Sequence, residues 1–400
     1  MASSLTQKKD FFSYLAQTSP APLALEIISA KGIWLKDTKG KKYVDLISGI
    51  AVSNLGHGYP AVVNAIKKQA DKHTHIMVYG EYVQSSQVNF ASKICKTLPS
   101  SLNSVYFVNS GSEAVEGALK LAKRYTGRTE IISFSQAYHG STHGALSVMG
   151  DEALKMPFRP LLPDIRILPF NDKKELQNIS RRTACVIIEP IQGEAGVVLP
   201  NKAFLQALRK RCNEVGAILI FDEIQTGFGR TGKLFAFEHF GVKPDILTIG
   251  KAMGGGLPLG AFIANNKVML SLSNDPALGH ITTFGGHPLS CAAGLAAFET
   301  LLNKKFHNSA AKKEKLFRSL LKHETIKEIR GMGLMLAVQF KSEEVCKKVI
   351  ENCIKNGIIV DWFLFRPDAM RIAPPLIITE KEIKEACKII LLSIKQSLSK

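Results

Sequence analysis

Three segments of the chain place polar or glycine residues directly after an apolar run, where a buried strand would end. The first reads Val-Asn-Ser-Gly-Ser-Glu over residues 108–113. A Ser/Gly turn that opens a helix presents backbone N–H groups, which can bind a phosphate. Ser112 and Gly111 also suit an ordinary helix cap and turn, so this segment by itself leaves both interpretations open.

The second segment is an apolar run, residues 217–221, that ends in Asp222 and continues through Ile224 and Gln225. A carboxylate that emerges from a buried strand usually has a cationic partner. P-loop ATPases have a similar strand, but the chain lacks the G-x-x-x-x-G-K-[ST] motif that this class requires. Asp222 is therefore either a helix or turn cap, or an anion that faces a cation.

The third segment contains Lys251, which follows the apolar run 246–249 and precedes three glycines at 254–256. Burial disfavours an ammonium group and lowers its pKa, which prepares the amine to form a Schiff base. A structural lysine held by an ion pair is the alternative for this residue.

Together, the three segments match the needs of one cofactor. Pyridoxal phosphate requires an amine for its aldehyde, an anion for its ring nitrogen and an amide cradle for its phosphate. Lys251, Asp222 and residues 110–112 would supply these groups from three strand ends. Ligands of open parallel sheets bind at the carboxyl ends of the strands, so the set predicts a pyridoxal-phosphate site.

The elements that must position these groups follow from the hydrophobic pattern. Short apolar or β-branched runs alternate with helical stretches such as 114–124 and 202–215. This alternation predicts an α/β fold with a mostly parallel, seven-stranded sheet that helices cover on both faces. The seven predicted strands are 105–108, 130–134, 165–168, 185–188, 217–221, 246–249 and 260–264.

The two ends of the chain differ from this central pattern. A hairpin is expected over 32–46, with its turn at Lys39-Gly40, and the chain after residue 300 is helical and basic with strands at 333–340 and 370–372. We expect a segment 1–50 that packs with the small domain, a large cofactor-binding domain 51–300, and a smaller α+β domain 301–400.

Composition excludes several other classes. The 400 residues are 46% hydrophobic, and no apolar run approaches the ~18 residues that span a bilayer. The first ten residues do not form a secretory signal, and the seven cysteines contain no C-x-x-C pair, so we expect a reduced, soluble, cytoplasmic protein. The net charge of +18 comes from dispersed lysine doublets without a basic arm, which predicts neither nucleic acid nor membrane as a partner.

Several motifs in order resemble those of the class III (ω-amino acid) aminotransferases, which are fold-type I pyridoxal-phosphate enzymes. The resemblance runs from about residue 23 to 378 and is greatest to ornithine and acetylornithine aminotransferases. The motifs are Asn54-Leu-Gly-His57, Ser110–Ala114, Tyr138-His-Gly140, Glu189–Glu194, Asp222–Gly227, Lys251, Thr283–Gly286, and Arg371 before Pro374-Pro375.

The resemblance implies a role for each cofactor-binding residue. Lys251 and Asp222 would be the catalytic pair: the lysine binds the cofactor and carries a proton, and the carboxylate keeps the pyridinium protonated. Tyr138 and Ile224 would sandwich the ring. The remaining residues of this group are Ser110, Gly111, Ser112, Glu189, Gln225 and Thr283 of the partner subunit. A threonine from a partner implies a homodimer with shared active sites.

No metal is expected. His139 and His143 have the i, i+4 spacing of metal ligands, but their neighbours are glycine and serine and no acidic partner is close in sequence. His139 is either a structural histidine or a residue that supports the site.

The resemblance also implies the substrate contacts. Arg371 would clamp a substrate carboxylate, and Glu194 would pair with Arg371 while an ω-amine reacts, then swing away to admit glutamate or 2-oxoglutarate. One site would thus serve both halves of a ping-pong cycle; a loop surface charge is the alternative for Glu194. The other predicted substrate-binding residues are Ser141, Thr282 and Ile50.

The chain departs from the family at Ser141. Ornithine and acetylornithine enzymes typically have an arginine there, which would hold the distal carboxylate with ~2–3 kcal/mol if desolvated. We expect transfer of the terminal amino group of an ornithine- or N-acetylornithine-like donor to 2-oxoglutarate, with a putrescine-type diamine or another ω-amine as the alternative donor. A silent cofactor-binding protein, an aminomutase and a decarboxylase are the alternatives outside this activity.

Overall fold

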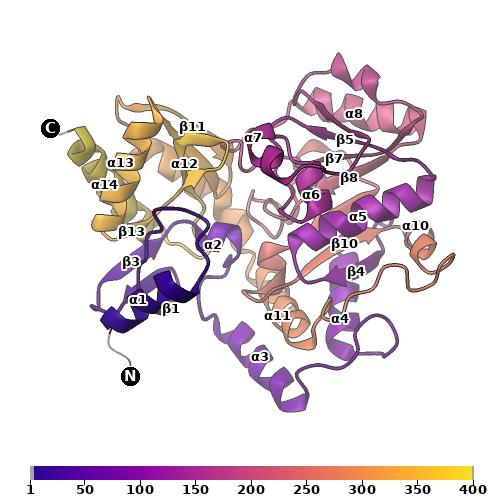
Figure 1. The fold of residues 1–400 in the computed structure, drawn as a ribbon. Helices are drawn as coiled ribbons and strands as arrows, with labels where there is room; N and C mark the ends of the chain where they lie inside the picture. Colours follow the sequence, from indigo (N-terminus) through magenta and orange to yellow (C-terminus); the bar gives the residue numbers. More distant parts are fainter. Residues whose placement is uncertain (1–3, 399–400) are drawn as a thin grey trace.

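A seven-stranded sheet forms the centre of the larger domain (Figure 1) in the computed structural model, which describes residues 4–398. Strand β10 is antiparallel to both of its neighbours, and every other pair is parallel. This confirms the predicted α/β fold with a mostly parallel sheet. The strands in spatial order are β4 (Ser104–Val108), β10 (Gly260–Ala264), β9 (Ile246–Ile249), β8 (Ile218–Asp222), β7 (Thr183–Ile188), β5 (Glu130–Phe134) and β6 (Ile165–Leu168).

Helices cover both faces of this sheet, which explains why its strands read as continuous apolar runs. Consecutive residues of β7 and β8 enter different cores: Ile187 and Ile220 pack with helix α5 (Gly111–Thr126), whereas Ile188 and Phe221 pack with α8 (Lys202–Val215). The remaining long helices of this domain are α3 (Pro60–Lys72), α4 (Ser85–Cys95) and α11 (Pro288–Lys304).

The two ends of the chain share a four-stranded sheet. Strands β2 (Trp34–Asp37) and β3 (Lys42–Asp45) form the predicted hairpin, β1 (Ile27–Lys31) pairs with β2, and β13 (Ile358–Ile359) pairs with β3 in parallel. The N-terminal segment therefore lies beside the C-terminal part of the chain (Figure 1).

A third sheet completes the smaller domain, with strands in the order β11 (Ile326–Met332), β12 (Met335–Phe340), β15 (Arg366–Ile372) and β14 (Trp362–Phe363). It packs with α12 (Ala310–Leu320) and α13 (Glu343–Lys355), and α14 (Glu380–Leu398) packs against both of these helices. Strand β11 was not predicted, because its charged side chains hide the apolar alternation. Helix α11 crosses the predicted boundary at residue 300, so that division stays a prediction.

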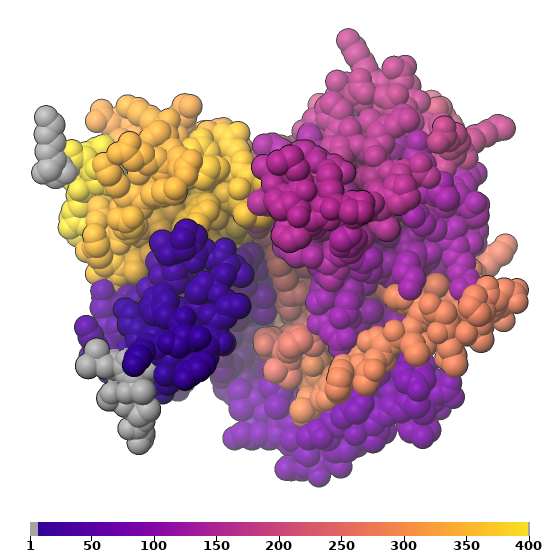
Figure 2. All heavy atoms as spheres, in the orientation of Figure 1, coloured from indigo at the N-terminus to yellow at the C-terminus, as the bar shows by residue number. Residues whose placement is uncertain are grey.

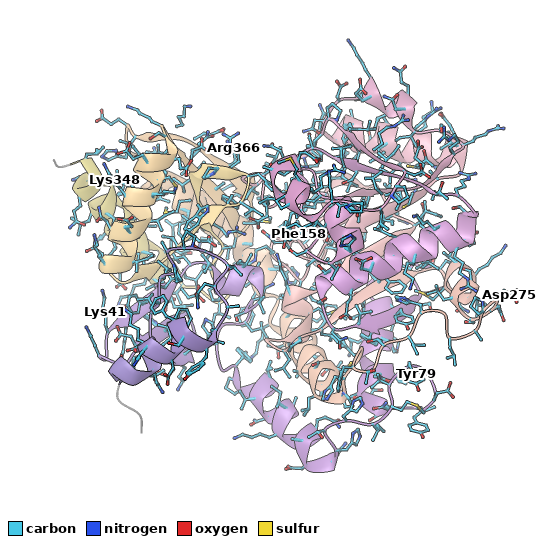
Figure 3. All side chains as sticks on the ribbon, in the orientation of Figure 1. Lys41, Tyr79, Phe158, Asp275, Lys348 and Arg366 are labelled. Carbon is cyan, nitrogen blue, oxygen red and sulfur yellow. The ribbon has the colours of Figure 1, made fainter. Side chains whose placement is uncertain are left out.

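Several surface lysines of the smaller domain have carboxylate partners one helical turn away. Lys347 and Lys348 lie 2.5 and 2.9 Å from Glu343 and Glu344, and Figure 3 shows Lys41 and Lys348 on the outside of this domain. Such pairs offset part of the positive charge locally. Among residues 4–398, no helix combines the length and the apolar character needed to cross a membrane.

Candidate active site

Lys251 follows β9 in the larger domain, with Gly250 between them. Its backbone has a φ of 48°, in the left-handed region that non-glycine residues seldom adopt, and such strain is typical of functional positions. Burial lowers the pKa of Lys251 to about 8, although the carboxylate of Glu194 opposes this shift. About a tenth of the amine is therefore neutral, and nucleophilic, at pH 7, far more than for an ordinary lysine.

Asp222 ends the neighbouring strand β8 and is bound from two sides. Its Oδ1 accepts a hydrogen bond from the Ile224 amide at 3.1 Å, and its Oδ2 lies 2.7 Å from Nδ1 of His139. Because the carboxylate accepts, Nδ1 carries the proton of this buried contact. His139 thus supports Asp222, which is the role that sequence analysis left open.

Glu189 directly follows β7, and both oxygens of its carboxylate accept hydrogen bonds from backbone amides. It accepts hydrogen bonds from the amides of Tyr138 at 3.0 Å and Gly193 at 2.9 Å. Burial raises the pKa of Glu189 to about 7. The two contacts fix the loop that carries Tyr138 against the strand that leads to Glu194.

The amide cradle forms at the start of α5. Ser110 caps this helix by accepting from the Glu113 amide at 3.2 Å, so the cap is Ser110 rather than Ser112. A Cβ added at Gly111 would come within 2.9 Å of Ile224, which explains why only glycine brings the backbone this close. Helix α5 has sixteen residues, and the free amides of its first turn lie at the positive end of its dipole, where an anion can bind.

These groups surround one cavity of about 190 Å³. Two features fit pyridoxal phosphate: Nε2 of His139 is buried without a hydrogen-bond partner, and a Cβ at Gly140 would come within 1.9 Å of the Ser112 hydroxyl. The amine, the carboxylate and the cradle that the cofactor requires all line this space. The lining residues are Gly111, Ser112, Tyr138, His139, Gly140, Glu189, Asp222, Ile224, Gln225 and Lys251.

An adjoining cavity of about 450 Å³ shares Lys251 and Tyr138 with the first. The other residues that line it are Gly49, Ile50, Glu194, Asp361, Trp362, Leu364 and Arg371. It is large enough for a small-molecule substrate, and it borders the amine of Lys251. We refer to it below as the substrate cavity.

Arg371 reaches the substrate cavity from β15 and is held by two carboxylates. Its Nη1 and Nη2 donate to Glu194 at 2.9 and 2.8 Å, and its Nε donates to Asp361 at 3.0 Å. Burial alone would raise the pKa of Glu194, but the guanidinium outweighs it and lowers that pKa to about 2. Burial likewise opposes the charge of Arg371, whose pKa the two carboxylates raise. Glu194 is buried, so the alternative of a loop surface charge is wrong.

Ile50 enters the substrate cavity from an unusual turn. Ser48, Gly49, Ile50 and Ala51 all have left-handed backbones, with φ between 51° and 62°. The Ser48 hydroxyl donates to the carbonyl of Ala373 at 2.7 Å, which ties this turn to the strand of Arg371. Surrounding contacts therefore maintain a backbone that would be strained in isolation.

Four predicted residues, Ser110, Ser141, Thr282 and Thr283, lie outside the lining of both cavities. The Ser141 hydroxyl is 3.3 Å from that of Tyr138, and the Ser141 amide donates to Ser112 at 3.0 Å. Thr282 accepts from Asn109 at 3.2 Å, and Thr283 is exposed. Gln225, which was predicted to bond the cofactor, does line the first cavity, and its side chain donates to Glu194 at 3.3 Å.

Sequence analysis missed four residues of the substrate cavity, Gly49, Asp361, Trp362 and Leu364. No local motif marks the last three, since they lie in a short stretch between β13 and β15 that only the fold brings to Arg371. Within residues 4–398, no three His, Cys, Asp or Glu side chains are arranged to hold a metal. His143 instead donates from Nε2 to the carbonyl of Pro160 at 3.0 Å.

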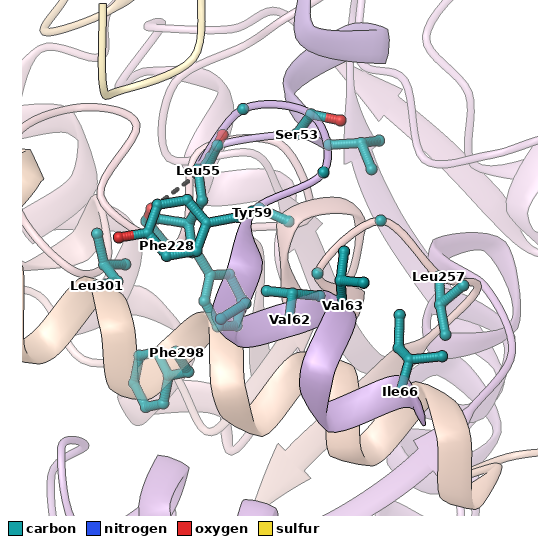
Figure 4. A pocket seen from close by; sticks show the side chains of 18 residues that line it. Ser53, Leu55, Tyr59, Val62, Val63, Ile66, Phe228, Leu257, Phe298 and Leu301 are labelled. Carbon is teal, nitrogen blue, oxygen red and sulfur yellow. Dashed lines mark hydrogen bonds between the residues drawn. The ribbon is translucent and has the colours of Figure 1, made fainter. Parts of the chain in front are cut away.

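A separate cavity of about 180 Å³ lies between α3 and α11 (Figure 4). Tyr59, Val62, Ile66, Leu257 and Phe298 are among its lining residues, and none of the residues that line it is charged. The side chain of Asn54 crosses its edge and donates to the carbonyl of Phe228 at 2.9 Å. Without a reactive group, this space offers no catalytic chemistry.

Known proteins resemble the chain over nearly its whole length. The family described as aminotransferase class-III matches residues 14–394. An acetylornithine aminotransferase from Methanopyrus kandleri is 41% identical over 363 residues, which cover 90% of this chain and 92% of that protein. Another, from Methanocaldococcus jannaschii, is 39% identical over 380 residues, with 90% of this chain and 91% of that protein covered.

Solved structures of transaminases also superimpose on this chain over nearly its whole length. The ornithine aminotransferase from Toxoplasma gondii superimposes with a TM-score of 0.90 at 30% identity, over 99% of this chain and 96% of that chain, and contains pyridoxal phosphate at partial occupancy. A transaminase from the marine bacterium Virgibacillus has a TM-score of 0.92 at 26% identity, with 99% of both chains covered.

Proposed function

The chain belongs to the class III aminotransferases, pyridoxal-phosphate enzymes that move an amino group between a small-molecule donor and a keto acid, and on this basis we propose its reaction. It transfers the terminal amino group of an ornithine- or N-acetylornithine-like donor to 2-oxoglutarate, which yields a semialdehyde and glutamate. The ion pair between Glu194 and Arg371 is the observation that carries this proposal.

The residues of the first cavity would hold the cofactor. When bound, pyridoxal phosphate supplies an aldehyde that takes up the amino group and a ring that accepts electrons. Lys251 would supply the amine that attaches the cofactor and, when free, would move a proton at the substrate carbon. Asp222, oriented by His139, would hold a proton on the ring nitrogen. The amides at Gly111 and Ser112 would bind the phosphate, and Tyr138 and Ile224, which line the same cavity, would contact the ring.

The substrate cavity explains how one site accepts two substrates. While Glu194 occupies Arg371, the guanidinium is neutralised, so the uncharged chain of an ω-amine can lie beside it. When Glu194 turns away, the freed guanidinium binds the α-carboxylate of glutamate or 2-oxoglutarate with two parallel hydrogen bonds. The alternation matches the two halves of a ping-pong cycle.

The donor assignment rests on relatives, and one observation favours a second candidate. Two curated relatives at 41% and 39% identity are acetylornithine aminotransferases. However, Ser141 offers no cation for a distal carboxylate, and its hydroxyl faces Tyr138. A diamine such as putrescine has no carboxylate to anchor, so it is the alternative donor.

We further infer a homodimer that shares its active sites. Thr283, assigned to the neighbouring subunit's cofactor by resemblance, is exposed within the segment 270–287, which crosses one face of the molecule in Figure 2. Leu278, Ile281 and Phe284 of this segment are more than half exposed, at 60%, 53% and 53%. Partner contact would bury this apolar surface.

All seven cysteines are free, which supports a reducing, cytoplasmic location.

The first experiment is an absorption spectrum of the holoenzyme, before and after addition of N-acetylornithine or ornithine without an acceptor. We expect the band of the lysine-bound cofactor to disappear and to return when 2-oxoglutarate is added. A band that responds to glutamate but to neither amino acid, nor to putrescine, would refute the proposed activity.

A further inference from the structure

Asp361 is a second carboxylate in the substrate cavity, and the backbone fixes it there. It lies between β13 and β14, and the amide of Arg371 donates to its carbonyl at 2.8 Å. Its Oδ1 accepts from Nε of Arg371 at 3.0 Å. Among the described residues, no hydrogen bond reaches Oδ2, although the side chain lines the cavity. One oxygen is therefore occupied and the other is available to a ligand.

The charges of the substrate cavity do not balance. Its lining residues include two anions, Glu194 and Asp361, and two cations, Arg371 and Lys251. Lys251 is committed to the cofactor in the adjoining cavity, so the single guanidinium faces two carboxylates. The nearby Asp45 is a further carboxylate, which raises the pKa of Asp361, and its own Oδ2 lies 2.7 Å from Nε2 of His57. The cavity consequently carries an excess negative charge.

The titration of Asp361 agrees with this count. Burial raises the pKa of Asp361 to about 6; Arg371 opposes this shift, and the carboxylate of Glu194 adds to it. The group is therefore ionised at neutral pH but incompletely compensated. A cation placed beside it would remove the imbalance.

The far end of the donor is the group that meets this charge. An ω-amine reacts at Lys251, so the rest of the donor must lie among the other residues of the cavity, where Trp362 and Leu364 can contact its methylene chain. No further cationic side chain lines this space. An N-acetylated donor brings a neutral amide and a carboxylate to this end, whereas ornithine and diamines bring an ammonium group.

We propose that Asp361 selects donors whose far end carries a free ammonium group, such as ornithine or a diamine, over N-acylated donors. This inference rests on the proposed function, because it assigns the substrate class of the same site. It differs from the acetylated donor that the names of the two curated relatives indicate.

The test follows the holoenzyme by stopped-flow absorption in the half-reaction without acceptor, which separates donor affinity from the rate of conversion. Ornithine and N-acetylornithine differ at the far end in the charge of one nitrogen, and putrescine and n-butylamine differ only by the terminal ammonium. We expect each charged donor to bind at least tenfold more tightly than its counterpart. Equal or reversed affinities within either pair would overturn the inference without any variant.

Asp361→Asn keeps the size of the side chain and removes its charge. We expect this variant to lose at least tenfold in affinity for ornithine and putrescine while N-acetylornithine changes little. The matched control is Asp368→Asn, since Asp368 pairs with Arg366 at 3.1 Å outside the cavity lining; it should retain the wild-type preference.

The remaining outcomes separate this inference from the proposed function. A loss by the same factor for all donors and for glutamate would show that Asp361 merely supports Arg371, and would overturn the selective role. A wild-type enzyme that reacts with glutamate but with no ω-amine would instead overturn the proposed function, and the inference with it.

Discussion

The guanidinium of Arg371 binds the carboxylate of Glu194 through two hydrogen bonds, of 2.9 and 2.8 Å, across 177 residues of sequence. Both side chains are buried, with 3% and 9% of their surface exposed. A buried pair of this kind is costly to break by removing one partner, because the other charge stays uncompensated. An incoming carboxylate avoids this cost by replacing Glu194 on the same guanidinium.

We predict that Glu194→Gln shifts the enzyme toward glutamate. The incoming carboxylate no longer competes with an anion, so affinity for glutamate should rise about tenfold, within the ~1.5–3 kcal/mol of a charged hydrogen bond. The ornithine half-reaction should slow, since Arg371 stays unmasked. Glu299→Gln is the control, because Glu299 pairs with Lys93 on the surface. Equal changes for both substrates, measured from the cofactor band, would contradict the gate.

Lys251→Ala should abolish amino transfer while the protein still folds. Loss of the proton carrier alone costs about 10²–10⁴-fold, and loss of the covalent attachment adds to it. The absorption spectrum should lack the lysine-bound band, and circular dichroism should match that of the wild type. Lys243→Ala, at an exposed position, should behave like the wild type. Normal turnover in Lys251→Ala would refute the mechanism.

Attachment of pyridoxal phosphate to the apo-protein should depend on pH in a defined direction. Burial lowers the pKa of Lys251 from 10.5 to about 8, and only the neutral amine reacts. The attachment rate should therefore rise with pH and level off above about 8. The unfolded chain holds this proton up to higher pH, so the lysine also makes the apo-protein more stable as pH rises from about 8 to 10.5. A rate that still climbs steeply above pH 10 would show an unshifted lysine.

Ser141→Arg tests whether the departure at this position sets the donor. An added guanidinium that reaches the distal carboxylate should improve the N-acetylornithine half-reaction by about tenfold or more, given ~2–3 kcal/mol for a charged hydrogen bond. Ser141→Met adds a side chain of comparable length without charge and should not help. If neither variant changes the donor preference, Ser141 has no part in selecting the donor.

Much of the cofactor site was predictable because its residues sit in local patterns. Lys251, Asp222 and the turn before α5 each follow an apolar run, and a run of that kind becomes a buried strand of a parallel sheet wherever the chain passes. The hairpin of β2 and β3 was equally local, since its turn and both strands are consecutive. Strand β11 was not predicted, because its charged residues obscure the alternation of apolar and polar side chains.

The sequence by itself determined the chemistry: an amine, a carboxylate and an amide cradle at three strand ends of one sheet. Tertiary structure alone decided the contact between His139 and Asp222 and the presence of Asp361 in the substrate cavity. A strand's residue pattern reports which face is buried, but not which distant side chain lies opposite. That depends on the path of the chain, here on β13 joining β3 and so placing Asp361 beside Arg371.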